Sequence, residues 1–407
     1  MQSKQQSLLS PKISRTATTV LMITIGFVMA LGLTQVTQAQ TLNVLHTLAG
    51  PEGATPDAGL TLDPAGNLYG TAYYGGLHGF GSVFELARIG SSWVVIPIYS
   101  FRGGDDGASP FGRVVFGPDG NLYGTTYAGG GSCGCGTVYK LTPPAHVSPS
   151  VFAGWTETVL YRFSDSDGNA PYGPVAFDQA GNLYGATWLG GVNDGCGLVY
   201  ELTPSAGMWT QRILHNFLNN GDGCQPTSGV ILDQAGNLYG VATFNIFQLV
   251  HTGNDWTFND LAVDGDYPFG GLIFDQLGNL FGTDLLGDVN GGGRVFELSP
   301  SSNGWIFTVL YDLPGDGNAY GPVDRLAMDP TGALYGTTYA QGTNGSGSIF
   351  KLTPSGQGWT YSELYDFTGA ADGAGPWGIT LMPNGDLLST TSYAGASGNG
   401  VIWEFTP

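Results

Sequence analysis

The chain has 407 residues, of which 68 are glycine, 12% are aromatic and only 11% are charged, and its formal net charge at pH 7 is −20. This composition is typical of a turn-rich all-β protein rather than of a charged disordered chain. The acidic balance argues against nucleic acid and anionic lipid as partners, because both bind basic surfaces, and leaves cations and neutral ligands such as glycans.

Residues 1–39 have the pattern of a secretory signal peptide. Three basic residues precede an apolar run of 14 residues at 20–33, and the small residues Thr37 and Ala39 suit a cleavage site. The apolar run is shorter than the about 20 residues that a spanning helix needs. We therefore expect a mature protein of residues 40–407, secreted or at the cell surface and not inserted in a membrane. The alternative is an uncleaved N-terminal anchor.

The rest of the chain consists of a repeat. A phrase close to Asp-x-x-Gly-Asn-Leu-Tyr-Gly-Thr-Thr-Tyr recurs seven times, 42 to 61 residues apart. A period of about 50 residues built from short strands is typical of a β-propeller with one blade per repeat. The central glycines of the seven copies are Gly66, Gly120, Gly181, Gly236, Gly278, Gly332 and Gly385.

One repeat, at 113–163, shows how a blade is encoded. Four runs of β-branched and aromatic residues are bounded by Gly, Pro or Asp, which predicts four strands joined by tight turns. Seven such units predict an all-β fold, a seven-bladed β-propeller of four-stranded blades that forms a single domain over 40–407.

The last blade lacks its outer strand at the end of the chain. Outer-strand phrases of the form Trp-x-x-x-x-Leu-Tyr-x-Phe follow the first six repeats, whereas the chain stops after a third strand at 401–405. A seventh such run lies at the mature N-terminus, at 42–48. We predict that 42–48 pairs into the C-terminal blade and closes the ring, so that only outer-strand edges stay exposed.

The repeat resembles a known family. Gly-Asn-Leu-Tyr-Gly-Thr-Thr followed by Gly-x-Val-Phe-x-Leu-Thr-Pro is similar to the GloVer tandem repeat of exported bacterial proteins, over essentially 42–407. That resemblance implies a secreted or surface location and no established activity. The fourth repeat departs from the pattern, because 241–249 has no Gly-rich loop. More remotely the phrase is similar to NHL and gluconolactonase-type propellers. The metal-binding channel positions of those enzymes cannot be placed in this sequence, so their chemistry is not carried over.

Binding residues are expected at one end of the blades. In a four-stranded meander, the Gly-rich loops share an end with the crossovers that lead into the next blade, and loops on a rigid scaffold commonly bind ligands. Aromatic residues recur there and could stack on sugars; the alternative is that they pack between blades. The candidates are Tyr73, Tyr127, Trp188, Tyr339, Trp377 and Tyr393. Two further departures from the repeat, Asp284 and Arg325, are weaker candidates.

Calcium is the expected ion, and no organic cofactor is expected. Asp165 and Asp167, and likewise Asp264 and Asp266, place carboxylates on alternate residues of a loop, which suits Ca²⁺. The alternative is that these carboxylates are solvated turn residues.

The four cysteines all fall in loops at the same end. In an exported protein an even count favours disulfides. We predict a Cys196–Cys224 bond, and a Cys133–Cys135 bond is possible but tight. A zinc site is the alternative, although no histidine lies near these loops in sequence.

No catalytic set stands out, because the five histidines are scattered over different blades. The sequence therefore favours a monomeric binding or scaffold module for carbohydrate or a protein partner over an enzyme. The alternative function is a carbohydrate-directed lyase, hydrolase or lactonase that uses channel-mouth carboxylates and Ca²⁺.

Overall fold

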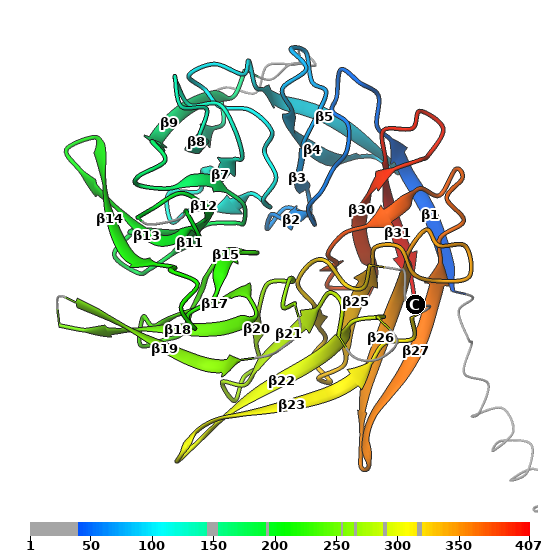
Figure 1. Cartoon of the computed structure of the whole chain (residues 1–407). Helices are drawn as coiled ribbons and strands as arrows, with labels where there is room; N and C mark the ends of the chain where they lie inside the picture. The colour runs from blue at the N-terminus through cyan, green and yellow to red at the C-terminus, as the bar shows by residue number, and fades with distance from the viewer. Residues whose placement is uncertain are drawn as a thin grey trace, which may run out of the picture. The chain divides into compact units, whose positions relative to one another are not determined.

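The computed structural model describes residues 40–144, 154–192, 195–253, 255–263, 267–287, 291–315 and 320–407. Gln40–Pro407 forms one compact unit, and the described residues contain strands, turns and loops but no helix. The strands form seven antiparallel sheets set around an axis, so the predicted seven-bladed β-propeller is confirmed (Figure 1). The signal-peptide prediction concerns residues outside the described ranges.

Each blade is a four-stranded meander that runs from the axis outward. The blades in order are β2 (Thr61–Leu62), β3 (Leu68–Ala72), β4 (Ser82–Ile89) and β5 (Ser92–Ser100); β6 (Val115–Phe116), β7 (Leu122–Thr126), β8 (Thr137–Thr142) and β9 (Thr156–Arg162); β11 (Ala176–Phe177), β12 (Leu183–Leu189), β13 (Leu198–Ser205) and β14 (Met208–Asn216); β16 (Ile231–Leu232), β17 (Leu238–Thr243), β18 (Asn245–Thr252) and β19 (Asp255–Val263); β20 (Ile273–Phe274), β21 (Leu280–Asp284), β22 (Arg294–Ser301) and β23 (Gly304–Asp312); β24 (Ala327–Met328), β25 (Leu334–Thr338), β26 (Ser348–Ser355) and β27 (Gly358–Asp366); β29 (Thr380–Leu381), β30 (Leu387–Tyr393), β31 (Val401–Thr406) and β1 (Thr41–Thr47). Short strands β10 (Asn169–Pro171), β15 (Cys224–Pro226) and β28 (Ala374–Pro376) extend the third, fourth and seventh blades.

The N-terminal strand closes the ring as predicted. β1 pairs antiparallel with β31, from Thr41 opposite Thr406 to Thr47 opposite Val401 (Figure 1). Leu48, just beyond β1, is fully buried in the core between the seventh and first blades. The two ends of the unit therefore share one sheet.

The hydrophobic core consists of layers between neighbouring blades, which explains why the aromatic positions recur. One layer holds Tyr123 of the second blade together with Tyr200 of the third. The tryptophan of an outer strand packs on the second-strand aromatic of the preceding blade, as Trp155 does on Tyr69 at 6.1 Å between ring centroids. Aromatic residues that recur in the repeat therefore pack between blades.

The repeated Asp-x-x-Gly-Asn turns lie at one end of the blades, which we call the turn face. Oδ1 of Asp63 accepts hydrogen bonds from the amides of Ala65 and Asn67, both at 2.8 Å, and its Oδ2 accepts one from Asn67 Nδ2 at 2.9 Å. Comparable contacts recur in later turns, so these carboxylates stabilise turns. The opposite end, which carries the Gly-rich loops and crossovers, is the loop face.

The fourth blade departs from the others as its sequence indicated. Its second and third strands are joined without a Gly-rich loop, with Ala242 paired to Asn245. The short connection places Phe244 in the left-handed region, at φ 67°, and leaves 49% of its side chain exposed on the loop face.

Candidate functional site

The crossovers of the loop face bring an aromatic cluster to the axis. In four blades the crossover ends in Pro-aromatic-Gly, and the four rings line one central cavity. We call these residues the aromatic collar: Phe111, Tyr172, Phe269 and Trp377. The ring centroid of Phe111 lies 4.1 Å from that of Tyr172 and 5.4 Å from that of Trp377. Only Trp377 of the collar was among the aromatic residues predicted to bind.

Three of the predicted aromatics form a row beside the collar. The ring centroid of Tyr127 lies 6.3 Å from that of Tyr73 and 6.2 Å from that of Trp188. Tyr73 also contacts Phe111, at 5.9 Å, and Trp188 contacts Tyr172, at 6.0 Å. All three side chains of the row are partly exposed.

The other three predicted aromatics form a second group on the same face. The ring centroid of Tyr339 lies 6.0 Å from those of Trp377 and Tyr393. Trp377 is buried, whereas 41% of Tyr393 is exposed. Because Phe111 contacts both Trp377 and Tyr73, the six predicted residues belong to one connected set of rings. Some of them pack, as the alternative interpretation expected, and the same set presents ring surface at the loop face.

Besides Asp324, the carboxyl group of Asp57 lines the cavity beside the collar. It occupies the first blade's counterpart of the collar position, directly after Pro56. Ser392 Oγ donates a hydrogen bond to Asp57 Oδ1 at 2.6 Å, and Trp377 Nε1 donates to the same Ser392 Oγ. Burial raises the pKa of Asp57 to about 7, against the opposing effect of its hydrogen bonding with Ser392 and Trp377. Asp57 is thus a group that can hold or release a proton near neutral pH.

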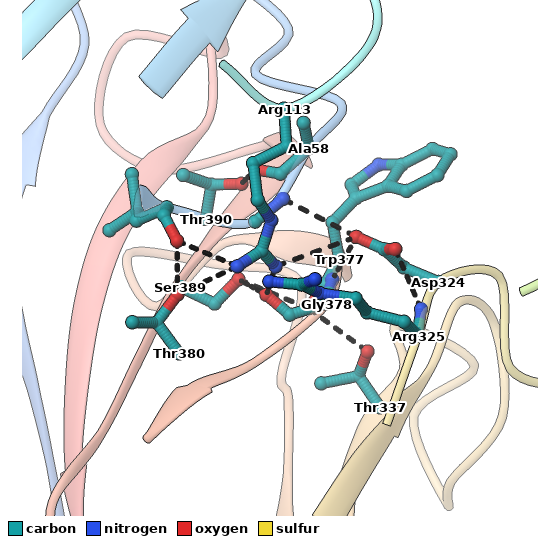
Figure 2. A network of polar contacts seen from close by, with 12 residues as sticks. Ala58, Arg113, Asp324, Arg325, Thr337, Trp377, Gly378, Thr380, Ser389 and Thr390 are labelled. Atoms are coloured by element: carbon teal, nitrogen blue, oxygen red, sulfur yellow. Dashed lines mark hydrogen bonds and ion pairs between the residues drawn. The ribbon is translucent and has the colours of Figure 1, made fainter. Parts of the chain in front are cut away.

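Figure 2 shows the side chain of Arg113 reaching toward Thr380 and Asp324, which belong to other blades. Its Nη1 donates to the carbonyl oxygen of Leu60 at 2.7 Å and to Thr380 Oγ1 at 3.2 Å, and its Nη2 lies 3.9 Å from Asp324 Oδ2. Burial lowers the pKa of Arg113 to about 9; the neighbouring Arg325 acts in the same direction and Asp324 opposes it. These contacts join the first, second, sixth and seventh blades.

Asp324 is held mainly by backbone amides. Its Oδ2 accepts hydrogen bonds from the amides of Gly378 at 3.2 Å and Gly59 at 3.4 Å, and its Oδ1 from the amide of Arg325 at 2.6 Å. A Cβ on Gly59 would overlap the Arg113 guanidinium, so the first blade needs glycine at that position. Of these axial residues the sequence analysis singled out only Arg325.

The position of Asp57 and Arg113 in the repeat could have identified them. Aligned on the crossover proline, Asp57 stands where the collar blades carry an aromatic residue. Arg113 and Arg325 stand at one equivalent position of the second and sixth blades, three residues after that proline, where the first, third, fourth and fifth blades carry glycine or proline and the seventh carries Ile379. The sequence feature that identifies both residues is therefore a departure from the repeat in the innermost segment of a blade.

The central cavity is small. Its volume is about 50 Å³, which is enough for a few water molecules but not for a sugar ring. A wider hollow of about 590 Å³ opens on the turn face, between the innermost strands, and both arginines line it. A ligand larger than water would therefore lie on the loop face or in the turn-face hollow, not between them.

The structure describes two of the four predicted calcium ligands, Asp165 and Asp167. Asp167 accepts a hydrogen bond from the amide of Ser164 at 2.7 Å and one from Tyr161 Oη at 2.8 Å, and Asp165 accepts one from Asn169 Nδ2 at 3.0 Å. Among the described residues no group of three or more His, Cys, Asp or Glu could hold a metal ion. Asp264 and Asp266 lie outside the described ranges.

Other crossover carboxylates stabilise their own loops in the same way as Asp167. Asp372 accepts a hydrogen bond from the amide of Thr368 at 2.8 Å and one from Tyr365 Oη at 3.0 Å. In the fourth blade His215 replaces this tyrosine, and its Nε2 lies 3.1 Å from Asp222 Oδ2. These acidic groups therefore have structural contacts of their own.

Asp284, the other departure noted from the sequence, is fully buried and forms an ion pair with Arg294 on the neighbouring strand. In the second blade the equivalent positions hold Thr126 and Thr137, whose hydroxyl oxygens lie 2.8 Å apart. The fifth blade thus replaces a hydroxyl pair by an ion pair, which accounts for Asp284 without a ligand.

Both predicted cysteine pairs are bonded. Cys196–Cys224 joins the Gly-rich loop of the third blade to the crossover that enters the fourth, and Cys133–Cys135 closes a two-residue step in a Gly-rich loop. No described cysteine is free. The zinc alternative for these residues is therefore wrong.

The chain resembles solved propellers in fold. A catalytically inactive virginiamycin B lyase from Staphylococcus aureus, with quinupristin, has a TM-score of 0.60 and 14% identity over 90% of this chain and 99% of that chain. The GH74 enzyme of Niastella koreensis has a TM-score of 0.55 and 18% identity over 89% and 53%. A PL25 ulvan lyase has a TM-score of 0.53 and 9% identity over 89% and 95%. Identities this low show the fold alone.

Two further comparisons bear on identity. No curated protein matches the sequence. Within the described residues, no helix is long and apolar enough to cross a membrane. A family model described as the Gloeobacter/Verrucomicrobia repeat matches residues 26–246, 151–306 and 244–407, and the chain therefore belongs to this repeat family.

Proposed function

We propose that this protein is an extracytoplasmic binding module that holds a carbohydrate on its loop face. The observation that carries the proposal is a row of three partly exposed rings, Tyr73, Tyr127 and Trp188, with about 6 Å between neighbouring centroids. Rings with one apolar face and a polar edge provide rigid contact surface for a ligand that is itself part apolar and part polar.

Three features favour a glycan over other ligands. The mature chain is strongly acidic, so polyanions would be repelled from most of its surface. The central cavity is too small for a sugar, so an extended ligand would lie across the rings rather than enter the axis. The two disulfides support a location in an oxidising compartment, where secreted glycans are accessible.

The test measures retention and product release in the same tubes. The chain from Gln40 to Pro407 is incubated with bacterial and plant polysaccharides in the presence of Ca²⁺, and bound protein and soluble sugar are both quantified. We expect retention on at least one polymer without product. Y127A and W188A should each weaken retention about tenfold, a loss of about 1.4 kcal/mol, whereas M208A, an exposed residue of a turn-face hairpin, should not.

The other outcomes distinguish carbohydrate binding from the alternative functions. Retention that survives both aromatic substitutions, or no retention on any polymer, would reject carbohydrate binding on the loop face and direct attention to a protein partner. Release of product would favour the second candidate function, a carbohydrate-directed enzyme. The observation behind that candidate is Asp57, whose pKa of about 7 and position beside the rings suit a general acid or base. In that case D57N should abolish product release while leaving retention intact.

A further inference from the structure

Among the residues that the structure describes, the turn-face end of the axis is lined by two arginines and by no carboxylate, although the protein is acidic. Only nine cationic side chains lie in 40–407, against 32 acidic ones, yet two of the nine, Arg113 and Arg325, lie together at the axis. The carboxylate nearest to Arg113, Asp324, already accepts three backbone amides. Counting one charge for each of the three side chains, this cluster keeps one net positive charge.

Arg325 differs from Arg113 in its contacts. Arg113 is buried and donates to Leu60 and Thr380, whereas the Arg325 side chain is partly exposed. No hydrogen bond or ion pair links the Arg325 guanidinium to any residue in the described ranges; its only polar contact there is through its backbone amide. Figure 2 shows its side chain extending toward the Arg113 guanidinium. The two guanidinium groups repel each other, and an anion bound beside them would reduce this repulsion.

The turn-face hollow gives such an anion access to Arg325. The hollow measures about 590 Å³, which lies within the range of small-molecule sites, about 300–1,000 Å³. Apart from the two arginines its wall is mainly apolar and includes Phe116, Phe274 and Met328 from three different blades. An adjoining hollow contains the turn carboxylates Asp275 and Asp329. These acidic neighbours disfavour ligands with several negative charges.

We propose that the turn-face hollow is a binding site for a small organic monocarboxylate with an apolar body. The carboxylate pairs with the planar fork of Arg325, with Arg113 behind it, and the apolar body contacts the innermost strands. A guanidinium matches a carboxylate through two parallel hydrogen bonds, which gives the site its preference for this group. The site lies on the opposite face from the proposed carbohydrate surface and does not depend on it.

The test is calorimetric titration of benzoate into protein expressed from the full-length sequence, at low salt. Benzyl alcohol, which lacks the charge, and sulfate, which lacks the apolar body, are titrated in parallel. We expect benzoate to bind about tenfold or more tightly than either. R325Q should weaken benzoate binding about tenfold, and R325K, which keeps the charge but not the fork, should weaken it by a smaller factor.

The matched control is R88Q, which removes one positive charge from an exposed position near the end of β4. It should leave benzoate affinity within about twofold of the unmodified protein, since exposed charges at long range are screened. The proposal is overturned if benzoate does not bind, if sulfate binds as tightly, or if R88Q weakens binding as much as R325Q. If R325Q does not fold, R325K provides the test instead. Unchanged benzoate affinity in R325K would reject the pairing of the carboxylate with the fork of Arg325.

Discussion

The carboxyl group at the collar makes stability depend on pH in a direction that can be measured. Asp57 has its pKa raised from 3.8 to about 7 in the folded protein, because the collar and its surroundings remove water from it. Raising the pKa of Asp57 from 3.8 to about 7 corresponds to about 4 kcal/mol between its two protonation states. Since Asp57 keeps a partial exposure, solvent screening should reduce this to about 2 kcal/mol.

The direction of the pH dependence follows from whether the folded or the unfolded chain binds the proton of Asp57 more tightly. The folded protein holds the proton of Asp57 more tightly than the unfolded chain does, so the stabilising contribution is complete below pH about 4 and is lost as the pH rises through about 7. D57N stays neutral at every pH and keeps an oxygen that can accept from Ser392. The free energy of unfolding of D57N should therefore exceed that of the unmodified protein by about 2 kcal/mol more at pH about 8 than at pH about 4.

The assay is a pair of thermal and urea unfolding series between those two pH values. The control is D255N, because the side chain of Asp255 is 90% exposed and its substitution should give a small, pH-independent difference. A D57N difference that stays constant with pH, or that grows toward acid, would refute the assignment of a neutral carboxyl group to the collar.

Three further perturbations test how the ring is held. Deletion of residues 40–48 removes β1 and the buried Leu48, whose loss alone costs about 2–5 kcal/mol, so calorimetry should show a sharply lower melting temperature; an unchanged melt would contradict closure by this strand. R113M should cost about 3–5 kcal/mol in urea unfolding, and adding D324N should recover part of that loss; no recovery would show that Arg113 acts by packing alone. Reduction of Cys196–Cys224, which spans 28 residues, should lower the free energy of unfolding by about 3–4 kcal/mol. Reductant should change the stability of the C196S/C224S protein much less, because the remaining Cys133–Cys135 bond closes a step of only two residues.

The fold was predictable because each recurring residue has a local physical reason. Gly70, in the Leu-Tyr-Gly-Thr strand, cannot carry a side chain, since a Cβ there would lie 2.5 Å from Phe84 Cζ on the next strand. Asp63 stabilises its turn within six residues of sequence. Such constraints act inside one blade or between neighbours, so a periodic sequence displays them directly. The position of the outer strand at 42–48 could likewise be found by counting strands.

The candidate site was less predictable because its residues become neighbours only when the ring closes. Arg113 and Thr380 lie 267 residues apart, and Asp57 and Ser392 lie 335 apart, yet both pairs are joined by hydrogen bonds at or beside the axis. A repeat pattern indicates which positions face the axis but not which of seven copies supply the partners. The departures that mattered, Asp57 and Arg113, each break the pattern in one or two blades. In a ring of near-identical blades, function therefore has to be sought where the symmetry fails, and the innermost segments are where a single substitution can reach several blades at once.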